Sequence, residues 1–174
     1  MKRILAISGS ARKQSTNGRI LEYLKEQSDQ DFRIFEGVQT LPHFSEDLDR
    51  DPPAAVQNFR KDLEECDGVL ICSPEYVFAL PGSFKNALDW LVSTIVLLNK
   101  PLAMIVAAAS GEEAFRSLRK ICETLGASIA EESALLVSGA RGKMDASGQP
   151  GDELQKDLLL VYESLRKQIQ AVGK

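Results

Sequence analysis

Histidine is almost absent from this 174-residue chain, and the cysteine spacing of metal and redox sites is missing. His43 is the single histidine, which excludes histidine-rich metal sites and leaves one candidate base for a serine triad. Cys66, Cys72 and Cys122 form no C-x-x-C pair, so we expect buried, reduced thiols rather than disulfides or metal ligands. Both metal chemistry and triad chemistry are therefore disfavoured.

Basic runs and membrane-length apolar runs are also lacking. The net charge is −4, with acids and bases mixed along the chain, which disfavours nucleic acid as a partner. The longest apolar stretches, Ile95 to Leu98 and Leu102 to Ala109, are interrupted by Asn99-Lys100-Pro101, so no membrane span is expected. At the amino terminus only four apolar residues precede Ser8, which indicates a strand rather than a signal peptide. We expect a cytoplasmic protein.

Alternating strand and helix patterns fill the chain without repeats or linkers, and predict one α/β domain over residues 1–174. The expected strands are Ile4–Ile7, Phe32–Phe35, Val69–Cys72, Leu102–Ala108 and a fifth within Ser128–Val137. The expected helices follow Gly18, begin at Pro52-Pro53, and cover about Ser83–Val92, Glu113–Leu125 and Leu154–Val172, with a loop at Glu36–Asp51. Apolar strands of this kind favour a three-layer sandwich: a five-stranded parallel sheet, order 2-1-3-4-5, with helices on both faces.

Ligands of such sheets bind beyond the carboxyl ends of the strands, where the strand order reverses between the first and third strands. Three loops would lie there: Ser8 to Gly18, Ser73 to Gly82 and Ala109 to Glu113. These three loops are the candidate site, and we refer to them as the first, second and third loops.

The first loop carries hydroxyl, amide and guanidinium groups just before a helix, where free N–H groups and the helix dipole favour anions. Hydrogen bonds to phosphate oxygens could come from the side chains of Ser10, Ser15, Thr16 and Asn17. Arg12 could add a planar, charged guanidinium group. The loop has neither the G-x-G-x-x-G nor the Walker A pattern, so a terminal monophosphate suits it better than a pyrophosphate. The alternative is that Thr16 or Asn17 only caps the helix while Arg12 is a solvated surface charge.

The second loop contains large apolar side chains where exposure is expected, namely Tyr76, Val77, Phe78 and Leu80. Such a cluster marks a ligand surface or a contact with a neighbouring subunit, and the two can occur together. Pro74 and Pro81 stiffen the ends of the loop, so that its backbone could meet a flat ring at little ordering cost.

Polar residues near the second and third loops have simpler explanations than catalysis. Glu75 is expected to make a backbone contact or to lie on the surface, and Ser110 and Gly111 would let the backbone approach a flat ligand. Lys85 and Asp89 are four residues apart on a helix, as in a solvated ion pair. Trp90 is more typical of a core or an interface than of a cofactor contact.

Two segments together resemble the NADPH-dependent FMN reductase family, whose fold is flavodoxin-like. Gly9-Ser10-x-Arg12-x-x-Ser15-x-Asn17 is similar to the phosphate loop of that family. Pro74-Glu75-Tyr76, followed by Pro81-Gly82-x-x-Lys85-Asn86-Ala87-x-Asp89-Trp90, is similar to its ring loop and following helix. The resemblance implies bound FMN, with Ser10, Arg12, Ser15 and Asn17 on its phosphate, Pro74, Glu75 and Tyr76 along its isoalloxazine, and Ser110 in a third contact loop. It also implies a homodimer or homotetramer with a shared flavin site.

The chain departs from this pattern at two places. Val77 stands where the family often has asparagine, and Glu112-Glu113 follows Ser110-Gly111 where the family is richer in glycine. Acids facing the site would repel the phosphates of a nicotinamide cofactor. The candidate cofactor-binding residues are Ser10, Arg12, Ser15, Thr16, Asn17, Pro74, Glu75, Tyr76, Val77, Ser110 and Gly111, with no catalytic side chain and no metal ligand.

The expected activity is an NAD(P)H-dependent oxidoreductase. NADPH or NADH would reduce bound FMN, and a small molecule (free flavin, a quinone, an azo dye or an oxidised metal ion) would accept the electrons. One alternative is a flavodoxin-like electron carrier without nicotinamide turnover, although such carriers tend to be more acidic. Another is a protein that binds a phosphorylated ligand without redox function.

Overall fold

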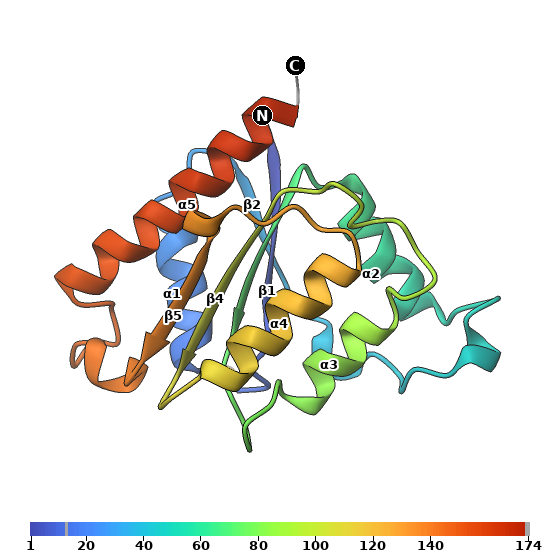
Figure 1. Cartoon of the computed structure of the whole chain (residues 1–174), viewed down its shortest axis with the longest axis horizontal. Helices are drawn as coiled ribbons and strands as arrows, with labels where there is room; N and C mark the ends of the chain where they lie inside the picture. The colour runs from blue at the N-terminus through green and yellow to red at the C-terminus, as the bar shows by residue number, and fades with distance from the viewer. Residues whose placement is uncertain (13, 173–174) are drawn as a thin grey trace.

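The computed structural model describes residues 1–12 and 14–172, and its centre is a parallel five-stranded sheet (Figure 1). The strands are β1 (Arg3–Ser8), β2 (Asp31–Phe35), β3 (Gly68–Ser73), β4 (Leu102–Ala108) and β5 (Ala134–Ser138). Their order is β2-β1-β3-β4-β5 and every pairing is parallel, which confirms the expected topology. The carboxyl ends of all five strands therefore meet at one edge of the sheet, the lower edge in Figure 1.

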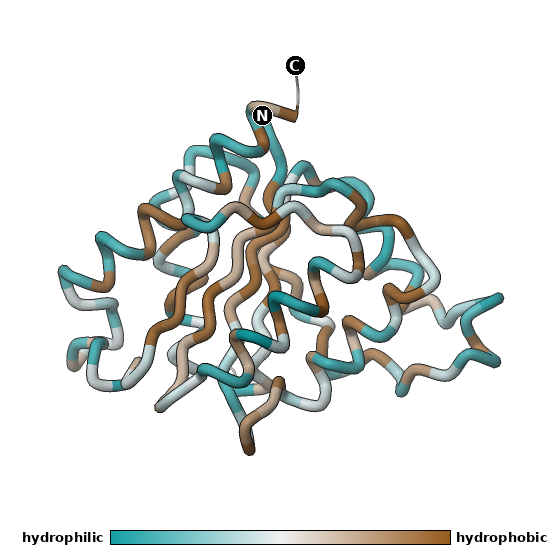
Figure 2. Tube along the Cα trace, in the orientation of Figure 1, coloured by the Kyte–Doolittle hydropathy of each residue, from teal (hydrophilic) through white to brown (hydrophobic). Residues whose placement is uncertain are grey.

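Helices cover both faces of the sheet, as the continuous burial of residues along the three central strands requires. The helices are α1 (Thr16–Glu26), α2 (Ala54–Glu65), α3 (Gly82–Asp89), α4 (Glu112–Thr124) and α5 (Asp152–Val172). Leu5 and Ile7 of β1 pack with α2, α3 and α4, whereas Ile4 and Ala6 pack with α1 and α5. Figure 2 shows the hydrophobic strands between the two layers of helices. The three-layer flavodoxin-like sandwich is thus confirmed.

Several expected element boundaries differ from the structure; for example, α3 ends at Asp89 rather than near Val92. α1 begins at Thr16 rather than after Gly18, because the Ser15 hydroxyl accepts the Gly18 N–H at 3.0 Å and caps the helix there. β5 begins at Ala134, near the end of the expected range, because Glu131–Ser133 forms a 3-10 helix. Within the expected loop at 36–51, two further 3-10 turns are present at Val38–Thr40 and Glu46–Leu48.

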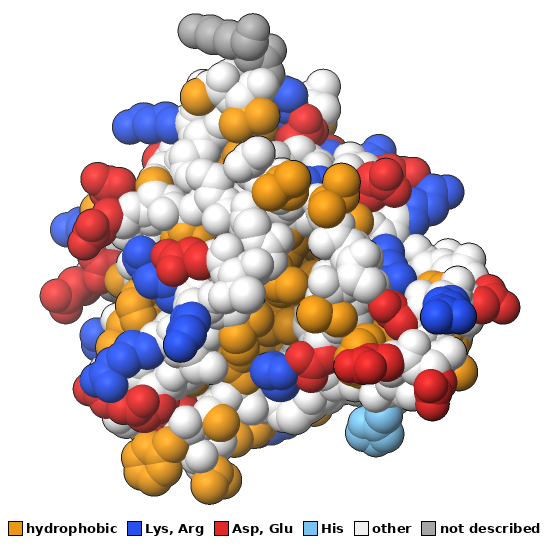
Figure 3. Space-filling view, turned by 45° about the vertical axis from the view of Figure 1, so that its right-hand side comes forward, with side chains coloured by type: hydrophobic (Ala, Val, Ile, Leu, Met, Phe, Trp, Pro, Cys, Tyr) orange, Lys and Arg blue, Asp and Glu red, His pale blue; other side chains and the backbone are white. Residues whose placement is uncertain are grey.

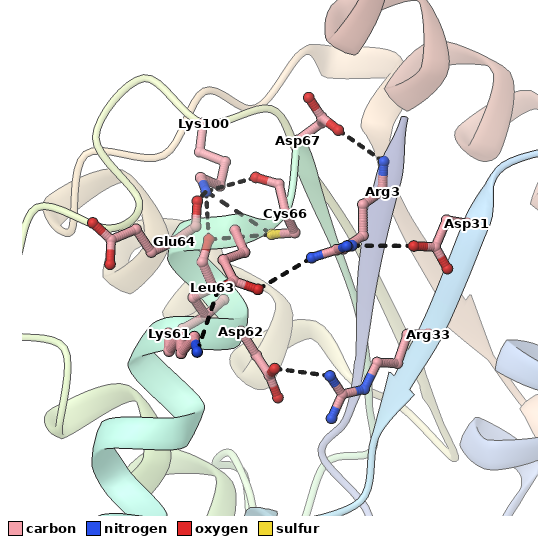
Figure 4. A network of polar contacts seen from close by, with 11 residues as sticks. Arg3, Asp31, Arg33, Lys61, Asp62, Leu63, Glu64, Cys66, Asp67 and Lys100 are labelled. Atoms are coloured by element: carbon pink, nitrogen blue, oxygen red, sulfur yellow. Dashed lines mark hydrogen bonds and ion pairs between the residues drawn. The ribbon is translucent and has the colours of Figure 1, made fainter. Parts of the chain in front are cut away.

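A network of polar contacts fixes the amino ends of the strands, at the opposite edge from the three loops (Figure 4). Arg3 pairs with Asp31 at 3.1 Å and with Glu65 at 3.2 Å, which ties β1 to β2 and to the end of α2. The Lys100 ammonium donates to the carbonyl oxygens of Glu64 at 3.2 Å and Cys66 at 2.7 Å, at the carboxyl end of α2. The amino edge is therefore occupied by the protein's own charges.

All three cysteines are free and buried, as expected. Trp90 is also fully buried, and its ring N–H donates to the carbonyl of Pro42 at 2.8 Å. Lys85 pairs with Asp89 on its own helix, which confirms the solvated-pair interpretation. Within residues 1–12 and 14–172 no helix is long and apolar enough to cross a membrane, and no group of three or more His, Cys, Asp or Glu could hold a metal ion.

Candidate functional site

The first loop is hydrogen-bonded to the end of β3, directly before the second loop. The Gly9 N–H donates to the carbonyl of Cys72 at 2.9 Å, which extends the β1–β3 ladder by one bond. A Cβ on Gly9 would lie 2.3 Å from the Ser73 hydroxyl oxygen, closer than any side chain tolerates. This close approach requires glycine at position 9 and holds the two candidate segments side by side.

The amino terminus of α1 has the features of an anion site. Its first turn, Thr16-Asn17-Gly18-Arg19, carries no acid, and its capping group is a neutral hydroxyl from Ser15. Ser10 and Ser15 lie in the loop that leads into this turn, with exposures of only 4% and 6%. The positive end of the helix dipole therefore meets no carboxylate from its own first turn.

The Asn17 side chain is held inside the protein rather than standing free in the first loop. Its Nδ2 donates to the carbonyl of Ala107 at 3.2 Å, and its Oδ1 accepts from the Cys72 thiol at 3.2 Å. Burial raises the pKa of that thiol far above its ordinary range, so it stays a neutral donor. Asn17 thus ties the start of α1 to β3 and β4, a role that its place in the motif did not indicate.

A cavity of about 400 Å³ opens beside the first loop. Ser10, Arg12 and Gln14 line it from the loop, together with Gly18 and Arg19 of α1. Phe35 closes it from the end of β2, and Val38 and Gln39 close it from the 3-10 turn that follows; Glu22 and Glu36 also line it. The Gln39 amide donates to the carbonyl of Ser10 at 3.1 Å.

Gln39 is a supporting residue that the sequence did not indicate, since it belongs to no motif and falls in the long expected loop after β2. Arg12 is exposed on the rim of the cavity, and its backbone N–H donates to the Ser10 hydroxyl at 3.3 Å. Thr16, the first residue of α1, is half-buried.

The second loop folds into a small hairpin beyond the end of β3. Pro74 is buried, and Tyr76 and Ala79 exchange two backbone hydrogen bonds of 2.9 and 3.1 Å. Val77 and Phe78 form the tip with exposures of 93% and 75%, whereas Tyr76 is 45% exposed. Leu80 is only 7% exposed and packs in the core, so its assignment to the exposed apolar group was wrong.

Glu75 connects the second and third loops. One carboxylate oxygen accepts the Gly111 N–H at 3.2 Å, and the other accepts the N–H groups of Glu113 at 3.1 Å and Ala114 at 3.0 Å. These groups form the amino terminus of α4, where the N-cap Gly111 has no side chain of its own to use. The expected backbone contact of Glu75 is confirmed, and it connects the second loop to the third.

The third loop is shaped by its own fold. Gly111 has φ of 104°, and a Cβ there would lie 2.8 Å from Leu136, so glycine is required at this turn. The exposed Ser110 hydroxyl donates to the Glu112 carboxylate at 2.7 Å. Glu112 and Glu113 of α4 therefore place negative charge at this edge and at their own helix terminus, and Glu112 also accepts the hydrogen bond from Ser110.

Comparison with known proteins agrees with this geometry. A family model described as NADPH-dependent FMN reductase matches residues 2–142. The chain is 30% identical to a 2-hydroxy-1,4-benzoquinone reductase from a Burkholderia species, over 97% of this chain and 90% of that protein. It is 31% identical to subunit CrdA of an NADH:(hydroxy)cinnamate reductase from Vibrio ruber, over 86% of this chain and 77% of that protein.

Among solved structures, the chain is similar to FerB, a flavoenzyme NAD(P)H:(acceptor) oxidoreductase from Paracoccus denitrificans. The TM-score is 0.81 at 25% sequence identity, and the match covers 98% of both chains. The resemblance carried by the two motifs is thus confirmed, and the chain belongs to the NADPH-dependent FMN reductase family.

Proposed function

We propose that this protein is an NAD(P)H-dependent, FMN-containing reductase that passes electrons to small-molecule acceptors such as quinones, azo compounds, free flavin or oxidised metal ions. One observation carries the proposal: the first loop, which holds one family motif, is hydrogen-bonded from Gly9 to Cys72 and packs on Ser73, at the start of the second loop with the other motif. A single FMN has a phosphate for one of these loops and a flat ring for the other.

The chemistry of the two helix termini at this edge fits FMN in one orientation. The α1 terminus has no acid in its first turn and is bordered by Arg12 and buried hydroxyl groups, whereas the α4 terminus is occupied by Glu75 and carries Glu112 and Glu113. A dianionic phosphate would be repelled at α4 and attracted at α1. We therefore assign the phosphate to Ser10, Arg12, Ser15 and Thr16, and to the backbone N–H of Asn17, whose side chain is engaged by Ala107 and Cys72.

The ring would lie along the second loop, against Pro74, Glu75, Tyr76 and the backbone of Val77, with Ser110 and Gly111 at its far side. Bound FMN would supply the redox chemistry, taking a hydride equivalent from NADPH or NADH and giving electrons to the acceptor. The protein's own part is to bind the phosphate, to hold the loops in one arrangement through Glu75, and to shield one face of the ring from water.

A spectrum of the purified protein tests this proposal. The protein should be yellow, or should become so with added FMN, and NADPH or NADH under nitrogen should bleach the flavin absorbance near 450 nm (a general property of flavins). Steady NAD(P)H oxidation with a quinone is expected as well. A colourless protein that gains no absorbance with FMN would refute the flavin site, and reduction without turnover would indicate an electron carrier instead.

Replacement of Arg12 by alanine tests the phosphate half of the site. One charged contact contributes roughly 1.5–3 kcal/mol, so Arg12→Ala should weaken FMN binding at least about tenfold, measured by fluorescence quenching on the apoprotein. Arg50→Ala is the control, because Arg50 is an exposed arginine outside the three loops. Equal affinities of the two variants would show that Arg12 points into solvent.

We further propose that residues 1–174 act as a single FMN-binding domain in a cytoplasmic homodimer or homotetramer. Support comes from the segment after α3, where Val92, Ile95 and Leu98 are 64%, 78% and 55% exposed. Apolar side chains gathered in this way are typical of subunit contacts. Light scattering on the holoprotein tests the proposal, and a monomer at micromolar concentration would contradict it.

A further inference from the structure

The tip of the second loop has a backbone that its residues do not favour. Val77 and Phe78 have φ of 51° and 57°, and the flanking Tyr76 and Ala79 are paired by two hydrogen bonds, as in a two-residue turn of type I′. Such turns are built from Asn-Gly or Asp-Gly, because both central residues must be left-handed. A β-branched residue there is a genuine outlier.

The side chains at the tip do not compensate for this backbone strain by packing against the rest of the protein. Val77 is 93% exposed and Phe78 is 75% exposed, so neither packs into the protein to offset the backbone energy. In Figure 1 the turn is the lowest point of the molecule, and in Figure 3 that lower end carries hydrophobic side chains. A strained, apolar and exposed turn beside a ligand site indicates a role in recognition.

We propose that Val77 and Phe78 form the apolar wall of the acceptor site and select planar aromatic acceptors, such as quinones, over small hydrophilic ones. The inference rests on the proposed function and concerns the acceptor alone. The tip is well placed for this role, because Glu75 fixes the base of the hairpin to α4 through three hydrogen bonds. Preorganised apolar groups bind a flat ligand without a further ordering cost.

A second copy of the chain fits the tip less well than a small molecule does. A phenylalanine buries about 150–250 Å² and a valine less, whereas a stable interface needs about 800 Å² on each partner. The side chains at the tip are therefore too small to form a subunit contact by themselves. They do suffice to cover one side of a bicyclic quinone.

The test is the variant Phe78→Gly, which removes the aromatic side chain and gives the second position of the turn the residue that its backbone favours. The apoprotein should unfold a few degrees higher than the wild type, because the strain is relieved. The affinity for FMN should stay within about twofold. For menadione kcat/KM should fall about tenfold, while the value for ferricyanide stays within about twofold. The dissociation constant of menadione, titrated against the FMN-loaded protein, should rise by a similar factor.

Leu160→Asn is the matched control, since Leu160 is a 67% exposed apolar residue on α5 and its replacement should change none of these values. An unchanged melting temperature, an equal loss for both acceptors, or a change in the mass of the oligomer would each overturn the proposal. The last result would instead identify the tip as a subunit contact. A wild-type protein without any NAD(P)H turnover would refute the proposed function, and the menadione titration would still test the tip.

Discussion

Removal of the Glu75 carboxylate should destabilise the protein more than any other charge change at the candidate site. The carboxylate accepts three backbone N–H groups, from Gly111, Glu113 and Ala114, at 3.0–3.2 Å. Gly111 is buried and has φ of 104°, so it offers no other cap to α4. In Glu75→Ala these donors lose the carboxylate that accepts them, and the three hydrogen bonds between the second and third loops are lost.

The magnitude follows from the number and kind of these bonds. Loss of a helix cap costs about 0.5–2 kcal/mol, and a hydrogen bond to a charged group contributes about 1.5–3 kcal/mol, but water replaces part of the loss at Glu113, which is exposed. We therefore expect Glu75→Ala to lower the free energy of unfolding by about 3 kcal/mol, a fall of about 6–12 °C in Tm for a domain of this size. Urea unfolding of the apoprotein, followed by far-UV circular dichroism, measures this without interference from FMN.

Glu113→Gln separates the hydrogen bonds from the simple effect of charge. Glu113 is an acid in the first turn of the same helix, pairs with Arg116 at 2.8 Å and is exposed, so its loss should cost only about 0.3–1 kcal/mol through the helix dipole. Glu75→Gln should fall between the two variants, because one amide oxygen can still accept. A Glu75→Ala variant within about 0.5 kcal/mol of Glu113→Gln would refute the claim that Glu75 connects the loops.

Two further predictions concern the interior near the site. Gly9→Ala would place a Cβ 2.3 Å from the Ser73 hydroxyl oxygen and should lower the free energy of unfolding in urea by about 1–3 kcal/mol. Gly82→Ala, with open space around its Cβ, should be neutral or stabilising. Equal effects of the two variants would contradict the close approach at Gly9. Burial raises the pKa of the Cys122 thiol from 9.0 to about 12 and that of Cys72 further, so unfolding releases their protons above pH 9. The free energy of unfolding should therefore fall by up to about 1.4 kcal/mol per pH unit for each thiol as the pH rises above 9. Cys122→Ala should lessen that slope. An unchanged slope in this variant would show that the Cys122 thiol titrates freely in the folded protein.

The sheet could be predicted from the sequence because its central strands are short, wholly apolar runs that only burial on both faces explains. Leu102–Ala108 was predicted to the residue, and β3 differs from its expected range by one residue at each end. The edge strand β5 was placed only within a range, since its residues are half-exposed and the preceding Glu131–Ser133 forms a 3-10 helix. An edge strand has a weaker hydrophobic pattern, and its ends depend on contacts from other parts of the chain.

The candidate site could be located from the sequence, but its internal contacts could not. The two motifs identified the loops, and the parallel topology required them to share an edge. The link from Gln39 to Ser10, and the bonds of Asn17 to Ala107 and Cys72, join positions 29 to 90 residues apart. No local pattern encodes such pairs, because each depends on the packing of separate elements. The burial of Leu80 was missed for the same reason.

The unequal charge of two helix termini explains why this edge would bind its ligand in one direction. Both α1 and α4 point their amino termini toward the same edge, so both dipoles favour an anion there. Glu75 already supplies that anion at α4, where its carboxylate accepts backbone hydrogen bonds. A free phosphate could bind at this terminus only by displacing the carboxylate, which is part of the chain. The α1 terminus is capped by the neutral Ser15 hydroxyl and keeps its attraction for a phosphate. The double variant Ser15→Asp, Glu75→Gln would place an acid at the α1 terminus and remove the one at the α4 terminus. It should therefore abolish FMN binding even where the fold survives, because the helix terminus beside Arg12 would no longer attract a phosphate.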